Sequence, residues 1–235
     1  MKLVGERRAL AALVLAFWFI NYLLAGIDSG VMFLFALAGV YGLAFVAVVA
    51  GYFWARWYAM GVCLFGVIIG AVGLWQTGIE PSNPLVFALM IFGGSHLLGT
   101  FMLVGSAMSE LFDGQKAWRE RFHMDDNAVQ RLGRSVIRAG VSLPLVLAYS
   151  LLPRQGGPAI VAAVLATLGF TALVRLRTWG VLALGAAGAL VLVAGGPAMH
   201  VHGIAVTLPP SLPGVLLIAA AVPFVRPMLR QLRSV

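Results

Sequence analysis

Residues 84–108, PLVFALMIFGGSHLLGTFMLVGSAM, decide the fold class of this chain. The run contains one ionisable side chain, His96, and is otherwise apolar or small. A helix needs about 20 apolar residues to cross the hydrocarbon layer of a bilayer. The stretch therefore predicts a transmembrane helix with a histidine inside it.

The rest of the chain has the same character. Of its 235 residues, 61% are hydrophobic and 10% are charged, and the mean hydropathy is +0.98. Soluble domains are roughly 25% charged, so lipid is the expected solvent for most of this chain. No stretch is long and polar enough for a separate soluble domain, and we predict one integral membrane domain over residues 1–235. The first apolar run lacks a small-x-small cleavage site, so we expect an uncleaved first span.

Eight apolar segments are separated by breaks that carry turn residues. We predict an all-α polytopic transmembrane helical bundle with spans at residues 9–26, 31–54, 58–76, 84–108, 136–153, 158–174, 180–198 and 212–229. The fifth and sixth segments give the weakest signal. If they formed a re-entrant pair, the number of spans would fall to six.

The basic residues predict the orientation, because Lys and Arg collect in cytoplasmic loops. With the N-terminus inside and eight spans, fifteen of the 16 Lys and Arg residues fall on the cytoplasmic side, and only Arg154 falls outside. Both termini are therefore predicted to be cytoplasmic. The net charge of +8 then marks one membrane face, which excludes a nucleic-acid role and favours contact with membrane lipids.

The one long connection, residues 109–135, predicts a cytoplasmic amphipathic hairpin. Leu111, Trp118 and Phe122 share one helical face, with Trp118 as an interfacial anchor. The neighbouring Arg119 and Arg121 are predicted as further interface anchors. A second helix is expected to start at Asp126 as its N-cap and to run into the fifth span. The hairpin is interpreted as a structural element at the interface, or as a docking surface for a cytoplasmic partner.

A faint repeat also occurs. Arg56 is followed directly by Trp57, and Arg177 is followed by Trp179 after one threonine; both arginines stand where one predicted span gives way to the next. Aligning these two arginines gives an offset of 121 residues, which fits a duplicated unit of four helices in a parallel orientation. Interfacial Arg and Trp are also expected at any such boundary, so chance remains the alternative.

His96 is the predicted ionisable group at depth, roughly 18 Å from the start of its span at 1.5 Å per residue. Ionisable groups inside a membrane are costly and are often functional. No carboxylate or second histidine at a similar depth is available to pair with it. His96 and Ser95 are therefore predicted either to contact a substrate or to make a polar contact with a neighbouring helix, packed closely through the surrounding glycines.

A second candidate is His200-Val201-His202, which falls in a predicted outer loop. Two histidines at i and i+2 face the same side of an extended strand, and His200 and His202 are thus candidate metal ligands. A metal site needs at least a third ligand, so a solvated loop is the alternative. Cys63 is the single cysteine, which excludes an intrachain disulfide, and we predict no cofactor.

Three functions fit these observations. The first is transport or permeation of an uncharged or lipid-like solute, lined by His96 and Ser95. The second is a non-catalytic accessory subunit of a larger membrane complex, and the third is a lipid-modifying enzyme that uses the outer-loop histidines. Expected partners are lipids, with other membrane subunits or further copies of the chain. Arg outnumbers Lys 14 to 2, which is typical of GC-rich coding and indicates a bacterial inner (plasma) membrane.

Overall fold

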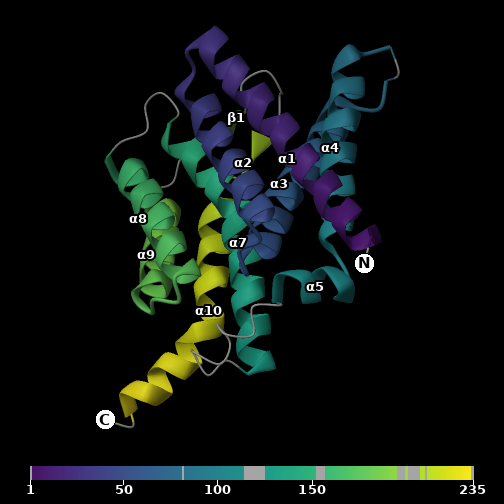
Figure 1. The fold of residues 1–235 in the computed structure, drawn as a ribbon. Helices are drawn as coiled ribbons and strands as arrows, with labels where there is room; N and C mark the ends of the chain where they lie inside the picture. The colour runs from purple at the N-terminus through teal and green to yellow at the C-terminus, as the bar shows by residue number, and fades with distance from the viewer. Residues whose placement is uncertain are drawn as a thin grey trace.

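Nine helices and one short strand pair make up the described part of the chain (Figure 1). The computed structural model describes residues 2–80, 82–113, 125–151, 157–194, 199–200, 207–209 and 211–233. The helices are α1 (Lys2–Ser29), α2 (Met32–Ala50), α3 (Ala55–Thr77), α4 (Pro84–Leu103), α5 (Ser106–Asp113), α7 (Asp126–Ser150), α8 (Gly157–Val174), α9 (Trp179–Ala194) and α10 (Ser211–Arg233). Strands β1 (Met199–His200) and β2 (Thr207–Leu208) pair antiparallel, with Met199 opposite Leu208.

Within the described residues, six helices are long and apolar enough to cross a membrane: α1, α2, α3, α4, α7 and α8. This confirms an all-α, multi-spanning membrane protein. The fifth and sixth predicted spans correspond to α7 and α8, which are both among these six, and α7 has the lowest mean hydropathy of the six, 1.2. The last two predicted spans correspond to α9, with 16 residues, and to the apolar part of α10, Ser211–Val225, which are shorter than the other six. Whether these two also cross, and which way the termini face, stay predictions.

Two predicted spans end earlier than the hydropathy indicated. The segment 31–54 leaves the helix after Ala50, where Gly51 takes up a left-handed conformation with φ 75°. The segment 84–108 leaves the helix after Leu103, and Gly105 with φ 114° turns the chain into α5. Figure 1 shows α5 lying across the end of the bundle rather than along it. Apolar residues continue past both helix ends, which explains why hydropathy placed the boundaries too late.

Arginines of α1 bind the ends of two other helices. The Arg7 guanidinium donates to the carbonyls of Phe101 and Val104 at the end of α4, and Arg8 Nε donates to Val48 O of α2 at 3.0 Å. The last carbonyls of a helix have no intrahelical donor and carry the negative end of its dipole. These bonds place the start of α1 beside the ends of α2 and α4, and we call this side the arginine-bearing end of the bundle.

The long helix α7 begins one residue away from the expected cap. The carboxylate of Asp125, and not that of Asp126, accepts a hydrogen bond from the Ala128 N–H at 2.7 Å. Asp126 is instead the first helical residue. From there α7 continues without a break to Ser150, as the sequence predicted for the second helix of the hairpin.

The helices form two groups of four. In the first, α1 and α3 each pack against both α2 and α4. In the second, α7 and α9 each pack against both α8 and α10. The groups meet where α7 packs against α3 and α2, and Figure 1 shows α7 between the first group and the pair α8 and α9. We call these groups the first unit (α1–α4) and the second unit (α7–α10).

The units touch most closely where two glycines face each other. A Cβ on Gly61 of α3 would lie 2.9 Å from the Cα of Gly140 of α7. Seven residues before Gly140 on α7, a Cβ on Gly133 would lie 2.8 Å from the Trp57 ring. Small residues let helix backbones approach in a membrane, so these glycines set the distance between the units.

The connection between α2 and α3 has the same geometry as that between α8 and α9. After α2, the N–H of Gly51 donates to Val48 O (3.3 Å) and that of Tyr52 donates to Ala47 O (3.2 Å). After α8, the N–H of Leu176 donates to Leu173 O (2.9 Å) and that of Arg177 donates to Ala172 O (2.8 Å). Both turns close with a left-handed residue, Gly51 or Leu176, as in the Schellman motif. With these turns aligned, Trp54 corresponds to Trp179, which is 125 residues further along the chain. This register differs by four residues from the alignment of Arg56 with Arg177, whose offset is 121 residues.

Candidate functional site: the His96 cluster

The helix that carries His96 has clear local signals. The Asn83 side chain caps α4 by accepting from the Leu85 N–H at 3.0 Å, and Pro84 occupies the first turn, where a missing N–H costs nothing. His96 lies three turns further along and is fully buried. The sequence thus brings this imidazole into the interior of the first unit rather than toward lipid.

Both ring nitrogens of His96 are hydrogen-bonded. Nδ1 lies 2.7 Å from the carbonyl oxygen of Phe92, and Nε2 lies 2.6 Å from the hydroxyl of Tyr41 on α2. A carbonyl only accepts, so Nδ1 carries the proton, and the neutral Nε2 accepts from the Tyr41 hydroxyl. The sequence analysis sought a carboxylate or a second histidine as the partner, whereas the structure supplies a phenol.

Trp18 of α1 covers the other side of this pair. Its indole stacks on the His96 ring with centroids 5.2 Å apart and an interplanar angle of 29°. Its Nε1 donates to Ser95 Oγ at 3.0 Å, and that hydroxyl donates to Phe92 O at 2.9 Å. The two residues singled out from the sequence, Ser95 and His96, therefore lie together and are held by one tryptophan.

The remaining helix of the first unit, α3, makes room for His96 because it has a glycine at position 66. A Cβ on Gly66 of α3 would lie 2.1 Å from Cδ2 of His96, so the imidazole occupies the space above this glycine. We call Trp18, Tyr41, Gly66, Ser95 and His96 the His96 cluster. It joins all four helices of the first unit. In this conformation its nitrogens are engaged, and the arrangement acts as a polar contact between helices.

The sequence analysis did not identify the hydrogen-bond partners of His96, although the sequence contains a weak indication of them. Tyr41 and Trp18 are aromatic residues with a polar tip inside apolar segments, and such tips need a hydrogen-bond partner when buried. A search for buried donors, rather than for opposite charges, would have pointed to both.

A second polar feature lies on α7. Ser135, Ser142 and Tyr149 are buried and recur at seven-residue intervals, which places them on one side of the helix. Ser142 Oγ donates to Arg138 O at 2.6 Å. Among the described residues, Ser135 Oγ and the Tyr149 hydroxyl have no hydrogen-bond partner. We call these three residues the hydroxyl stripe, which the sequence analysis did not recognise.

Arg138 lies within α7, near the start of the predicted span 136–153, and the count of basic residues placed it on the cytoplasmic side. Its Nη1 donates to Ala219 O of α10. That carbonyl lacks its usual helical donor because the residue four positions later, Pro223, has no N–H. Arg138 thus supplies the hydrogen bond to Ala219 O that Pro223 cannot supply, and this contact also satisfies part of the Arg138 guanidinium.

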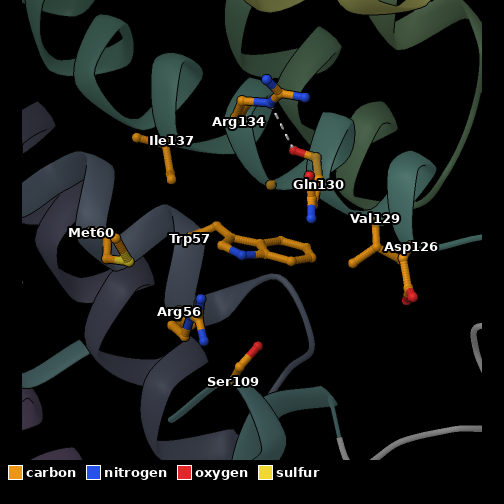
Figure 2. Close-up of a pocket in the computed structure, with 10 residues that line it drawn as sticks. Arg56, Trp57, Met60, Ser109, Asp126, Val129, Gln130, Arg134 and Ile137 are labelled. Carbon is orange, nitrogen blue, oxygen red and sulfur yellow. Dashed lines mark hydrogen bonds between the residues drawn. The ribbon is translucent and has the colours of Figure 1, made fainter. Parts of the chain in front are cut away.

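A cavity of about 460 Å³ opens between α3, α5 and α7 at the arginine-bearing end. Figure 2 shows the Trp57 indole lying between Arg56 on one side and Gln130 on the other, with Arg134 beyond Gln130. Its lining consists of Arg56, Trp57, Met60, Ser109, Asp126, Val129, Gln130, Gly133, Arg134 and Ile137. We call it the arginine-end cavity; none of these residues was a predicted site residue.

The predicted metal ligands and interface anchors fall largely outside the described residues. His200 belongs to β1, but its side chain and all of His202 are outside them, as are Trp118, Arg119 and Arg121. In the described part of the chain, no group of three or more His, Cys, Asp or Glu residues is placed to hold a metal ion. Metal binding and interfacial anchoring therefore stay predictions.

Comparison with known proteins gives no relative. No protein-family model, no curated protein and no solved structure matches this chain. The chain is therefore described by its own residues, as a multi-spanning membrane protein with at least two buried polar features and one open cavity.

Proposed function

We propose that the chain moves an uncharged or lipid-like solute across the membrane, along the hydroxyl stripe of α7, which lies on the side of that helix that carries Arg138 and faces away from α3. The observation that carries the proposal is the pair of buried hydroxyls on Ser135 and Tyr149 without a partner in the described residues. A buried hydroxyl left unsatisfied costs about 1–3 kcal/mol. Such groups in a folded protein call for an explanation, and a passing polar group of a solute satisfies them.

The chemistry of α7 supports this solute class. The stripe offers uncharged hydroxyls, and Arg138, the arginine that stands between Ser135 and Ser142 in the sequence, is already bound to Ala219. The two units, joined through the glycine contact of Gly61 and Gly140, fit the parallel repeats seen in transporter folds. The similar turns at Gly51 and Leu176 support a repeat.

The test uses purified protein in liposomes and two probes: glycerol, followed by light scattering, and a fluorescent diacylglycerol, followed by quenching from outside. Ser135→Ala and Tyr149→Phe remove one oxygen each with little change in shape. We expect transport of at least one probe by the wild type and a severalfold slower flux in both variants. Their thermal stability should stay the same or rise, because removing an unsatisfied buried hydroxyl is neutral or stabilising.

A matched control is Ser150→Ala, because this hydroxyl lies off the stripe and already donates to Leu147 O at 2.9 Å. Its flux should equal that of the wild type. If neither probe moves faster than through protein-free liposomes, or if the stripe variants transport normally, the proposal is wrong.

The earlier prediction that Ser95 and His96 line the route becomes a narrower proposal. In the described conformation Tyr41 and Trp18 occupy their polar atoms, so a route past His96 requires these contacts to open during transport. The alternative functions are tested separately. Stoichiometric subunits that co-purify from the native membrane would favour an accessory role, and a metal-dependent activity lost in His200→Ala and His202→Ala would favour an enzyme.

A further inference from the structure

The arginine-end cavity has a chemistry that the transport proposal does not use. We propose that it binds the phosphodiester headgroup of a membrane phospholipid. A volume of about 460 Å³ lies within the range of ordinary ligand sites, roughly 300–1,000 Å³. The cavity is bounded by helices from both units, so its occupant contacts α3 and α7 together.

Two guanidinium groups supply the attraction for phosphate. Arg56 comes from the first turn of α3, and Arg134 comes from α7 on the other side of Trp57 (Figure 2). Arg134 Nε is bonded to Gln130 O at 3.4 Å, and in the described residues its terminal nitrogens make no hydrogen bond. Guanidinium forks are well matched to phosphate oxygens. The cavity also lies at the N-terminal end of α7, where the helix dipole favours an anion.

The residues that line the cavity change from charged or polar to apolar along α3 and α7, which favours a lipid over a free anion. Along α7 the lining passes from Gln130 and Arg134 to Ile137, and along α3 it passes from Arg56 to Met60. Both walls thus become apolar in the direction that leads into the membrane-crossing part of each helix. A phospholipid has the same sequence of a charged head followed by an apolar body, whereas inorganic phosphate has no apolar part.

Two further lining residues, Trp57 and Asp126, indicate which kind of headgroup the cavity prefers. The Trp57 side chain is an amphipathic ring of the type that gathers at membrane interfaces, and it is held in place against Gly133. The carboxylate of Asp126 also lines the cavity. It disfavours a purely anionic ligand and accepts hydrogen bonds from a hydroxyl or an ammonium group. The preferred head therefore carries such a donor next to its phosphate, as glycerol and ethanolamine heads do.

The experiment uses the full chain purified in mild detergent and then stripped of lipid. Phosphatidylglycerol, phosphatidylethanolamine, phosphatidylcholine and inorganic phosphate are added separately. Binding is measured by native mass spectrometry and by the rise in melting temperature. We expect the first two lipids to bind, phosphatidylcholine to bind more weakly, and inorganic phosphate to have no effect.

The variant Arg134→Gln removes one cation from an exposed position and should fold normally. We expect it to weaken lipid binding by about fivefold, the effect of losing one solvent-accessible charged contact. Arg131→Gln is the matched control, because Arg131 lies on the same helix but does not line the cavity. Its lipid binding should equal that of the wild type.

Three results would overturn the proposal. The first is equal lipid binding by the Arg134 and Arg131 variants, and the second is no phospholipid binding by the wild type. The third is binding of inorganic phosphate with the same dependence on Arg134, which would make the ligand a soluble anion. Because binding is measured without a gradient, these outcomes are independent of whether the chain transports a solute.

Discussion

The imidazole of His96 fills the space that a side chain on Gly66 would need. A Cβ at position 66 would lie 2.1 Å from Cδ2 of His96, far inside van der Waals contact. The histidine and the glycine are 30 residues apart on neighbouring helices, so the identity of one constrains the other. The first unit is packed around this contact.

The variant Gly66→Ala should therefore be strongly destabilised. Overpacking a tight interior costs about 1–3 kcal/mol, and here the added methyl meets a ring held by two hydrogen bonds. Gly94→Ala on α4 is the matched control, since nothing lies within 4 Å of its Cβ position, and there the higher helix propensity of alanine should leave stability unchanged or raised. Thermal unfolding in detergent measures both. Equal melting temperatures for the two variants would contradict the close contact.

Tyr41→Phe tests the hydrogen bond to His96. The change leaves Nε2 without its donor in a buried site and should lower stability by about 1 kcal/mol, given that hydrogen bonds between membrane helices contribute modestly. Tyr58→Phe is a suitable control, because its hydroxyl reaches Val40 O only at 3.4 Å and its loss should cost less. If Tyr58→Phe lowers the melting temperature as much as Tyr41→Phe does, the special role of the Tyr41 contact is refuted.

The fold class was predictable from the sequence, because an apolar run of about 20 residues in lipid can satisfy its backbone hydrogen bonds only as a helix. The helix ends were less predictable. Gly51 and Gly105 end α2 and α4 inside apolar sequence, so hydropathy gave no boundary. The His96 cluster was found in part: the apolar run around His96 and Ser95 placed both residues inside a span, but Trp18 and Tyr41 come from other helices. Only the three-dimensional packing brings such distant positions together.

The hydroxyl stripe and the arginine-end cavity show the same limit. Ser135 and Tyr149 are uncharged, so a census of ionisable residues passed over them. Arg56 and Arg134 looked alike in sequence to the other arginines of the basic face. Their special position depends on the packing of α3 against α7, which is set by the glycine contact between Gly61 and Gly140.

Arg138 and Pro223 should be energetically coupled. Arg138 donates to Ala219 O because Pro223 provides no N–H to that carbonyl. Replacing the arginine, as Arg138→Met, should cost about 1–3 kcal/mol by leaving the carbonyl unsatisfied. In a Pro223→Ala background the backbone N–H takes over, and the same replacement should cost much less.

A double-mutant cycle of thermal stabilities measures this coupling. Arg131→Met is the control on the same helix, since its Nε bonds Asn127 O one turn away and does not involve α10. Its effect should not depend on residue 223. Additive effects of Arg138→Met and Pro223→Ala would show that the cation does not replace the missing hydrogen bond.

The orientation predicted from the basic residues can be tested by labelling single introduced cysteines. The native Cys63 is fully buried and should not react with a membrane-impermeant maleimide. Ser211 is exposed at the start of α10, and Gln130 is exposed on α7 near the arginine-bearing end. With that end in the cytoplasm, Ser211→Cys should label in intact cells, whereas Gln130→Cys should label only after lysis. The reverse pattern would place the arginines outside. Labelling of both from outside would mean that the two positions do not lie on opposite faces, and the number of crossings between them would then be even.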